Sequence, residues 1–121
     1  MRMLVALAAM AACKADRPPP SPAEVTDRGW HAHELVVAAG ERAQTCADAG
    51  VAMRTVFAAN RQAFVDAVAL DQDRDRLRIA TDWLETHAQR YADLEPRMEA
   101  LSERCGSDAV VQGVFREMES P

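Results

Sequence analysis

Apolar and small residues recur three and four positions apart along two long stretches of this chain, a spacing that predicts amphipathic helices. The positions of the first seam are Val36, Ala39, Ala43, Cys46, Gly50, Met53, Phe57, Asn60, Phe64 and Ala67. No proline follows Pro22 before Leu70, and the glycines of this stretch are isolated. The pattern predicts one long helix over residues 22–70, either continuous or broken near Gly40 or Gly50.

A second seam with the same spacing predicts a second long helix. Its positions are Leu77, Ala80, Leu84, His87, Tyr91, Leu94, Met98, Leu101 and Cys105. Pro96 removes one backbone hydrogen bond within this helix and predicts a bend near Ala92. Between the seams, the polar run from Asp71 to Asp75 predicts a turn whose carboxylates cap the second helix. A calcium loop is the alternative, but Arg76 stands where such a loop requires glycine.

Folding the two helices into an antiparallel hairpin about this turn places small residues opposite large ones, as close packing requires. The predicted pairs are Ala67 with Leu84, Phe64 with His87, Asn60 with Tyr91, Phe57 with Leu94, Met53 with Met98, Gly50 with Leu101, and Cys46 with Cys105. The composition, 49% hydrophobic but only 5% aromatic, also favours helices over strands. We therefore expect an all-α fold, either a long antiparallel helical hairpin or a small three-helix bundle, with a short C-terminal helix.

Residues that cap helices mark where the first and last helices begin. Ser21 is a candidate N-cap, with Pro22 in the first helical position and Glu24 completing a capping box. Gly106 is expected to end the second helix, and Ser107 to cap a short final one. That final helix carries one apolar stripe, which must pack on the hairpin or on a partner. The residues of this C-terminal apolar stripe are Val110, Val111, Val114, Phe115 and Met118.

The first thirteen residues have the three-part pattern of an export signal. Arg2 supplies a positive charge, residues 3–12 are uncharged and mostly apolar, and small residues precede Cys13. An apolar stretch of this length is too short to span a bilayer as a stable helix. The tetrad Met10-Ala11-Ala12-Cys13 resembles the lipobox of bacterial lipoproteins, whose usual form is Leu-Ala-Gly/Ala-Cys.

This resemblance implies that residues 1–12 are a signal peptide and that Cys13 becomes the lipidated N-terminus. The acyl chains on Cys13 would anchor the protein in a membrane. Residues 13–21 would form a Pro-rich tether to a helical domain of residues 22–121. Lys14 resembles the outer-membrane sorting signal of enteric lipoproteins, which implies the periplasmic side of the outer membrane. The alternative is an uncleaved apolar N-terminus on a cytoplasmic protein, with Cys13 an ordinary thiol.

With Cys13 assigned to lipid, Cys46 and Cys105 are the only cysteines left to pair within the chain. An exported protein passes through an oxidising compartment, where such a pair normally forms a disulfide. The bond would close a loop of about 60 residues and contribute roughly 4 kcal/mol in the chain-entropy model. A redox-active pair is the alternative, but such pairs usually have Cys-x-x-Cys spacing.

No residue pattern in the chain is typical of a catalytic, phosphate-binding or metal site. His31 and His33 are two positions apart, so they lie on different sides of a helix and are expected at the surface. Haem ligation would need His87 and Met98 on one iron, but they are eleven residues apart on one predicted helix, roughly 16 Å. No enzyme activity, metal or cofactor is therefore expected.

Charge and exposed apolar surface bear on possible partners. The net charge of −5 and the interleaved signs along the helices make nucleic acid an unexpected partner. We expect a lipid-anchored interaction or structural module of the cell envelope, held to the membrane by Cys13 and meeting a protein partner through the C-terminal apolar stripe. The alternative is a bundle that binds a small ligand or haem in a pocket near His87, Tyr91 and Asn60.

Overall fold

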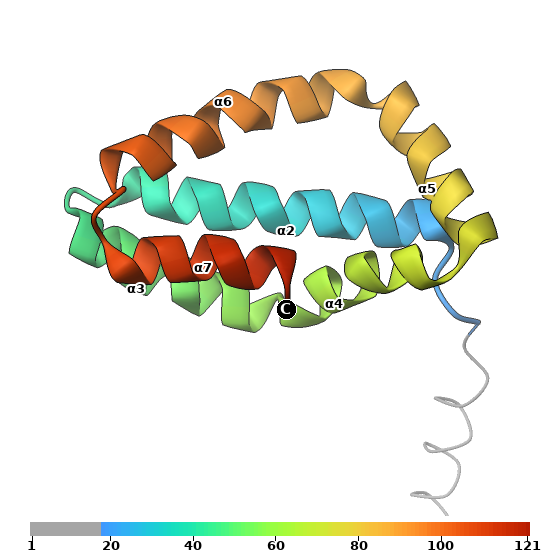
Figure 1. Cartoon of the computed structure of the whole chain (residues 1–121), viewed down its shortest axis with the longest axis horizontal. Helices are drawn as coiled ribbons and strands as arrows, with labels where there is room; N and C mark the ends of the chain where they lie inside the picture. The colour runs from blue at the N-terminus through green and yellow to red at the C-terminus, as the bar shows by residue number, and fades with distance from the viewer. Residues whose placement is uncertain (1–17) are drawn as a thin grey trace, which may run out of the picture.

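The computed structural model describes residues 18–121, so the predicted signal peptide and Cys13 lie outside the described residues. This part of the chain is all-α, as predicted, and contains no strand (Figure 1). The α-helices are α2 (Pro22–Arg42), α3 (Cys46–Ala59), α4 (Arg61–Ala69), α5 (Arg74–Thr86), α6 (Ala88–Arg104) and α7 (Ala109–Glu119), with a short 3₁₀ helix, η1, over Leu70–Gln72. None of the described helices combines the length and the apolar character needed to cross a membrane.

Helix α2 is the centre of the fold. In Figure 1 it runs between α6 on one side and α3 and α4 on the other, and it also contacts α5. Its buried face is made of small and β-branched residues, including Ala32, Val36, Val37 and Gly40. Ser21 caps its start as predicted, because the Ser21 hydroxyl accepts a hydrogen bond from the backbone N–H of Glu24 at 3.2 Å.

The first predicted helix is not continuous, because the chain turns back on itself after α2. Ala43 leaves the helical conformation, and Thr45 caps α3 by accepting a hydrogen bond from the Asp48 backbone N–H at 3.1 Å. The break lies just beyond Gly40, near one of the two positions predicted for it. Helix α3 then packs along α2.

Two further breaks arise where a side chain competes for a helix carbonyl. Asn60 Nδ2 donates to the Val56 carbonyl at 2.8 Å at the junction of α3 and α4. His87 Nδ1 donates to the Trp83 carbonyl at 2.7 Å at the junction of α5 and α6. Such local hydrogen bonds weaken the helical pattern. The second predicted helix is therefore divided at His87, while Pro96 lies inside α6.

The predicted hairpin register is right at the Cys46–Cys105 pair, the one farthest from the predicted turn, and wrong at the next pair toward that turn. Cys46 and Cys105 form the predicted disulfide, with their Cα atoms 5.4 Å apart. Gly50, however, faces α7 and not Leu101, since a Cβ atom added to Gly50 would lie 2.9 Å from Val110 Cγ1. The structure is thus neither a simple hairpin nor a plain three-helix bundle, because α2 contacts α3 and α4 as well as α5 and α6.

Helices α2 and α6 run parallel and are joined by ion pairs at heptad spacing. Arg90 lies 2.5 Å from Asp27 and 2.5 Å from Glu34, and Arg97 lies 2.6 Å from Glu41. The hydrogen bond from Arg97 lowers the pKa of Glu41. These contacts orient α6 so that its arginines face α2.

The C-terminal apolar stripe is largely covered within the chain. Val111, Val114 and Met118 are buried, and α7 packs mainly on α3. Asp108 caps α7, accepting from the backbone N–H groups of Val110 and Val111, so the prediction of Ser107 as the cap is wrong. The Asp carboxylate is the stronger acceptor, since a charged group also complements the helix dipole.

Candidate functional site

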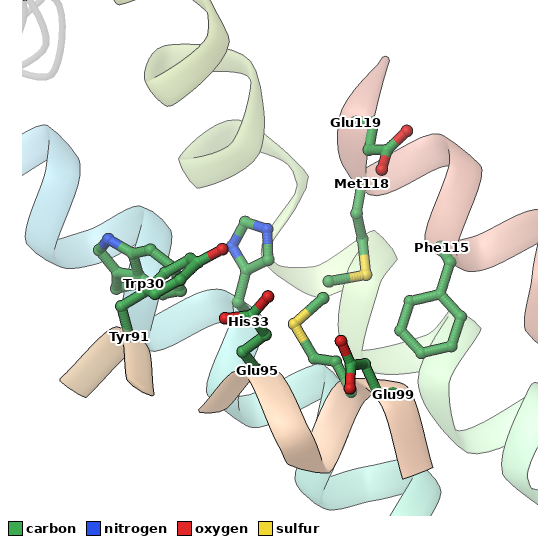
Figure 2. Close-up of a pocket in the computed structure, with 9 residues that line it drawn as sticks. Trp30, His33, Tyr91, Glu95, Glu99, Phe115, Met118 and Glu119 are labelled. Atoms are coloured by element: carbon green, nitrogen blue, oxygen red, sulfur yellow. The ribbon is translucent and has the colours of Figure 1, made fainter. Parts of the chain in front are cut away.

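A cleft of about 340 Å³ lies between α2, α6 and α7 (Figure 2). Trp30 and His33 come from α2, while Phe115 and Met118 point in from α7. The full lining is Trp30, His33, Tyr91, Glu95, Met98, Glu99, Phe115, Met118 and Glu119. We refer to it below as the α2–α6–α7 cleft.

An aromatic wall forms one side of the cleft and continues into the core. The rings of Trp30 and Tyr91 meet edge to face with centroids 5.1 Å apart. Behind them, His33 contacts Phe64 at 4.7 Å between centroids, and Phe64 contacts Phe57 at 5.0 Å. Because Phe64 and Phe57 are fully buried, this wall is held in place by the core.

His33 is half-buried, so the surface position predicted for it holds only in part; His31 is exposed as predicted. His33 Nδ1 donates a hydrogen bond to the Gly29 carbonyl at 2.8 Å. Burial lowers the pKa of His33, an effect only partly opposed by this hydrogen bond. The ring is therefore neutral at pH 7, with Nε2 as an acceptor.

The rim of the cleft is acidic. Glu95, Glu99 and Glu119 line it and are exposed, whereas no Lys or Arg lines it among residues 18–121. None of these three glutamates takes part in an ion pair within that range, because the arginines of α6 are turned toward α2. Helix α6 thus presents arginines to α2 and two glutamates, Glu95 and Glu99, to the cleft.

A second cavity, of about 230 Å³, lies between α2, α4 and α5. Trp30 and His33 line both cavities. The second one is more apolar, with Leu70, Leu77 and Leu84 in its wall. It lacks the acidic rim, since Asp71 is its only charged lining residue within the described chain.

The pocket predicted around His87, Tyr91 and Asn60 does not form as such. Tyr91 lines the α2–α6–α7 cleft, but His87 stacks on Trp83 with ring centroids 3.9 Å apart, and Asn60 lies at the α3–α4 junction. Neither His87 nor Asn60 lines either of the two cavities described above. Among residues 18–121, no three His, Cys, Asp or Glu side chains lie together as a metal site would require.

Sequence reasoning missed Trp30 and the three glutamates. Glu95 and Glu99 are four positions apart, which places both on one face of α6. That spacing was visible, but nothing in it indicated that Glu119 and Trp30 would meet the same face. Comparison of the chain with known protein families, with characterised proteins and with solved structures gives no match.

Proposed function

We propose that this protein is an exported, lipid-anchored helical module of the cell envelope that binds its ligand in the α2–α6–α7 cleft. The cleft itself carries the binding part of the proposal. It combines an apolar, aromatic wall with a few polar groups and falls in the size range of small-ligand sites. The role is one of binding, without a catalytic step.

Export and anchoring are supported by two features far apart in the sequence. The Cys46–Cys105 disulfide is the kind of bond that persists in oxidising compartments. Met10 to Cys13 resembles a lipobox, and the prolines Pro18, Pro19 and Pro20 suit a tether. Lys14 favours the periplasmic side of the outer membrane as the destination.

A small ligand accounts for the geometry better than a protein partner on the C-terminal apolar stripe. Val111, Val114 and Met118 are already buried inside the chain, so a partner on α7 would reach mainly Val110 and the half-buried Phe115. The cleft, in contrast, leaves Tyr91 48% exposed beside Trp30. Aromatic surface of this kind is well suited to a ligand.

Anchoring is tested by replacing the proposed lipid attachment site. The Cys13→Ser protein should move from the membrane fraction to the soluble fraction, or accumulate with its leader uncleaved. Ala15→Ser is the matched control, because it introduces a serine beside the proposed anchor without removing a cysteine and should leave fractionation unchanged. Unchanged, detergent-dependent fractionation of the Cys13→Ser protein would refute the anchor.

Ligand binding is tested with a neutral, water-soluble probe, 2-methyl-1-phenyl-2-propanol, followed by calorimetry on the full chain. Tyr91→Ala should weaken its binding severalfold, because it removes exposed aromatic surface from the cleft. Ile79→Ala is the matched control, since Ile79 is similarly exposed at 45% and lines neither cavity. Equal losses in both variants would contradict the proposed site.

A further inference from the structure

The α2–α6–α7 cleft has a charge that selects among small ligands. Three carboxylates surround it, while no Lys or Arg lines it in the described residues. Because the cleft is partly enclosed by apolar side chains, these charges act on a bound ligand with less screening than they would on an open surface. A cationic ligand is therefore favoured over a neutral or anionic one of the same shape.

The wall of the cleft suits a soft, weakly hydrated cation. Trp30 and Tyr91 present π-systems, and tryptophan gives the strongest cation–π attraction of the side chains. Met98 and Met118 add polarisable thioethers, which adapt to an irregular apolar body. A hard metal cation would need converging oxygen ligands in place of this apolar wall.

We propose that the α2–α6–α7 cleft binds a small organic cation with an apolar body, of the quaternary or tertiary ammonium class. The inference rests on the proposed function, because it names the ligand class of the same cleft. The ammonium group lies between the aromatic wall and the rim glutamates, and the apolar body packs on Phe115, Met98 and Met118. The neutral ring of His33 adds no opposing charge.

The test compares two probes of nearly the same shape that differ in charge. Benzyltrimethylammonium carries the cation, and 2-methyl-1-phenyl-2-propanol replaces the charged nitrogen with carbon and one methyl with hydroxyl. Each is titrated into the full chain by calorimetry at low salt. We expect the cation to bind at least tenfold more tightly than the alcohol, and salt to reduce that preference.

A charge-matched pair of variants identifies the groups responsible. The cleft variant is Glu95→Gln/Glu99→Gln/Glu119→Gln, and the control variant is Glu85→Gln/Glu103→Gln/Glu117→Gln. Both raise the net charge by the same amount, but only the first changes the cleft rim. The cleft variant should weaken cation binding roughly tenfold and leave alcohol binding unchanged, while the control variant should alter both by less than about twofold.

Each outcome decides one claim. Tight cation binding that the cleft variant alone reduces supports the proposal. Equal binding of both probes overturns the cation preference but leaves the cleft as a ligand site, so the proposed function would stand. Equal effects of the two variants would mean general charge attraction and would also overturn the inference, while binding of neither probe would overturn it together with the ligand site.

Discussion

Loss of the Cys46–Cys105 disulfide should remove a large share of the stability of the folded part. The bond joins residues separated by 59 positions, the start of α3 to the residue after α6. In the chain-entropy model, closing a loop of that length costs the unfolded chain roughly 14 cal/mol/K, or about 4 kcal/mol at 25 °C. Small domains are stable by only about 5–15 kcal/mol, so the reduced protein should be marginal.

The assay is urea unfolding of the full chain, oxidised and reduced, together with the Cys46→Ala variant. Cys46 is only half-buried whereas Cys105 is 1% exposed, so Cys46→Ala removes the bond with little loss of core packing. Reduction and Cys46→Ala should each lower the free energy of unfolding by about 4 kcal/mol. With an unfolding entropy of roughly 0.2 kcal/mol/K for about 100 residues, the melting temperature should fall by about 20 °C.

Non-additivity provides the control. The Cys46→Ala/Cys105→Ala protein should lose at most about 1–2 kcal/mol beyond Cys46→Ala, because the bond can be lost only once, and reducing agent should not affect either variant. If reduction changes the free energy of unfolding by less than about 1 kcal/mol, or if both thiols alkylate freely in the native exported protein, the reasoning is refuted.

Two further predictions concern α2. Gly40→Ala should destabilise the protein by about 1–3 kcal/mol in urea unfolding, because the new Cβ would lie 2.7 Å from Leu101 Cδ2; Gly113→Ala, whose nearest atoms are 3.8 Å away, should be neutral or stabilising, and equal effects would contradict the packing. Burial lowers the pKa of His33, so the unfolded chain takes up a proton at this residue more readily than the folded chain does. The free energy of unfolding should therefore decrease as the pH is lowered through about 6.5. His33→Asn should reduce that fall between pH 7.5 and 5.5 while His31→Asn should not, and identical profiles for both would contradict the buried position.

The all-α class and the cap at Ser21 were predictable because they depend on local chemistry. The disulfide pairing was predictable because only Cys46 and Cys105 remained once Cys13 was assigned to lipid. The turn after α2 also has a local signal, since Thr45 and Asp48 have the spacing of an N-cap and its first-turn acid. It was overlooked because Ala43 and Cys46 continue the apolar spacing through the turn. A periodic pattern alone does not show whether a helix continues or folds back.

The parallel packing of α2 and α6 illustrates a second kind of limit. Arg90 and Arg97 are seven residues apart, as are their partners Glu34 and Glu41, so complementary heptads are present in the sequence. Exposed ion pairs contribute little energy, however, and the arginines of α6 and the glutamates of α2 would also suit an ordinary solvated surface. The packing of the apolar faces decides which charged residues come into contact.

The cleft could not be predicted from the sequence for a related reason. It requires side chains from α2, α6 and α7, and their meeting depends on the helix breaks at Ala43, Asn60 and His87 and on the packing of α7 alongside α3. Small residues on α2, such as Gly29 and Gly40, allow its neighbours to approach closely. Larger side chains then surround the space that remains between the helices, which is the cleft.

The most direct test of an exported, lipid-anchored protein is the intact mass of the chain purified from membranes of its own host, without reduction. The account predicts a polypeptide that begins at Cys13, carries the added mass of a diacylglycerol group, and lacks two hydrogens because Cys46 and Cys105 are joined. A chain that still begins at Met1, with no lipid and three free thiols, would contradict it.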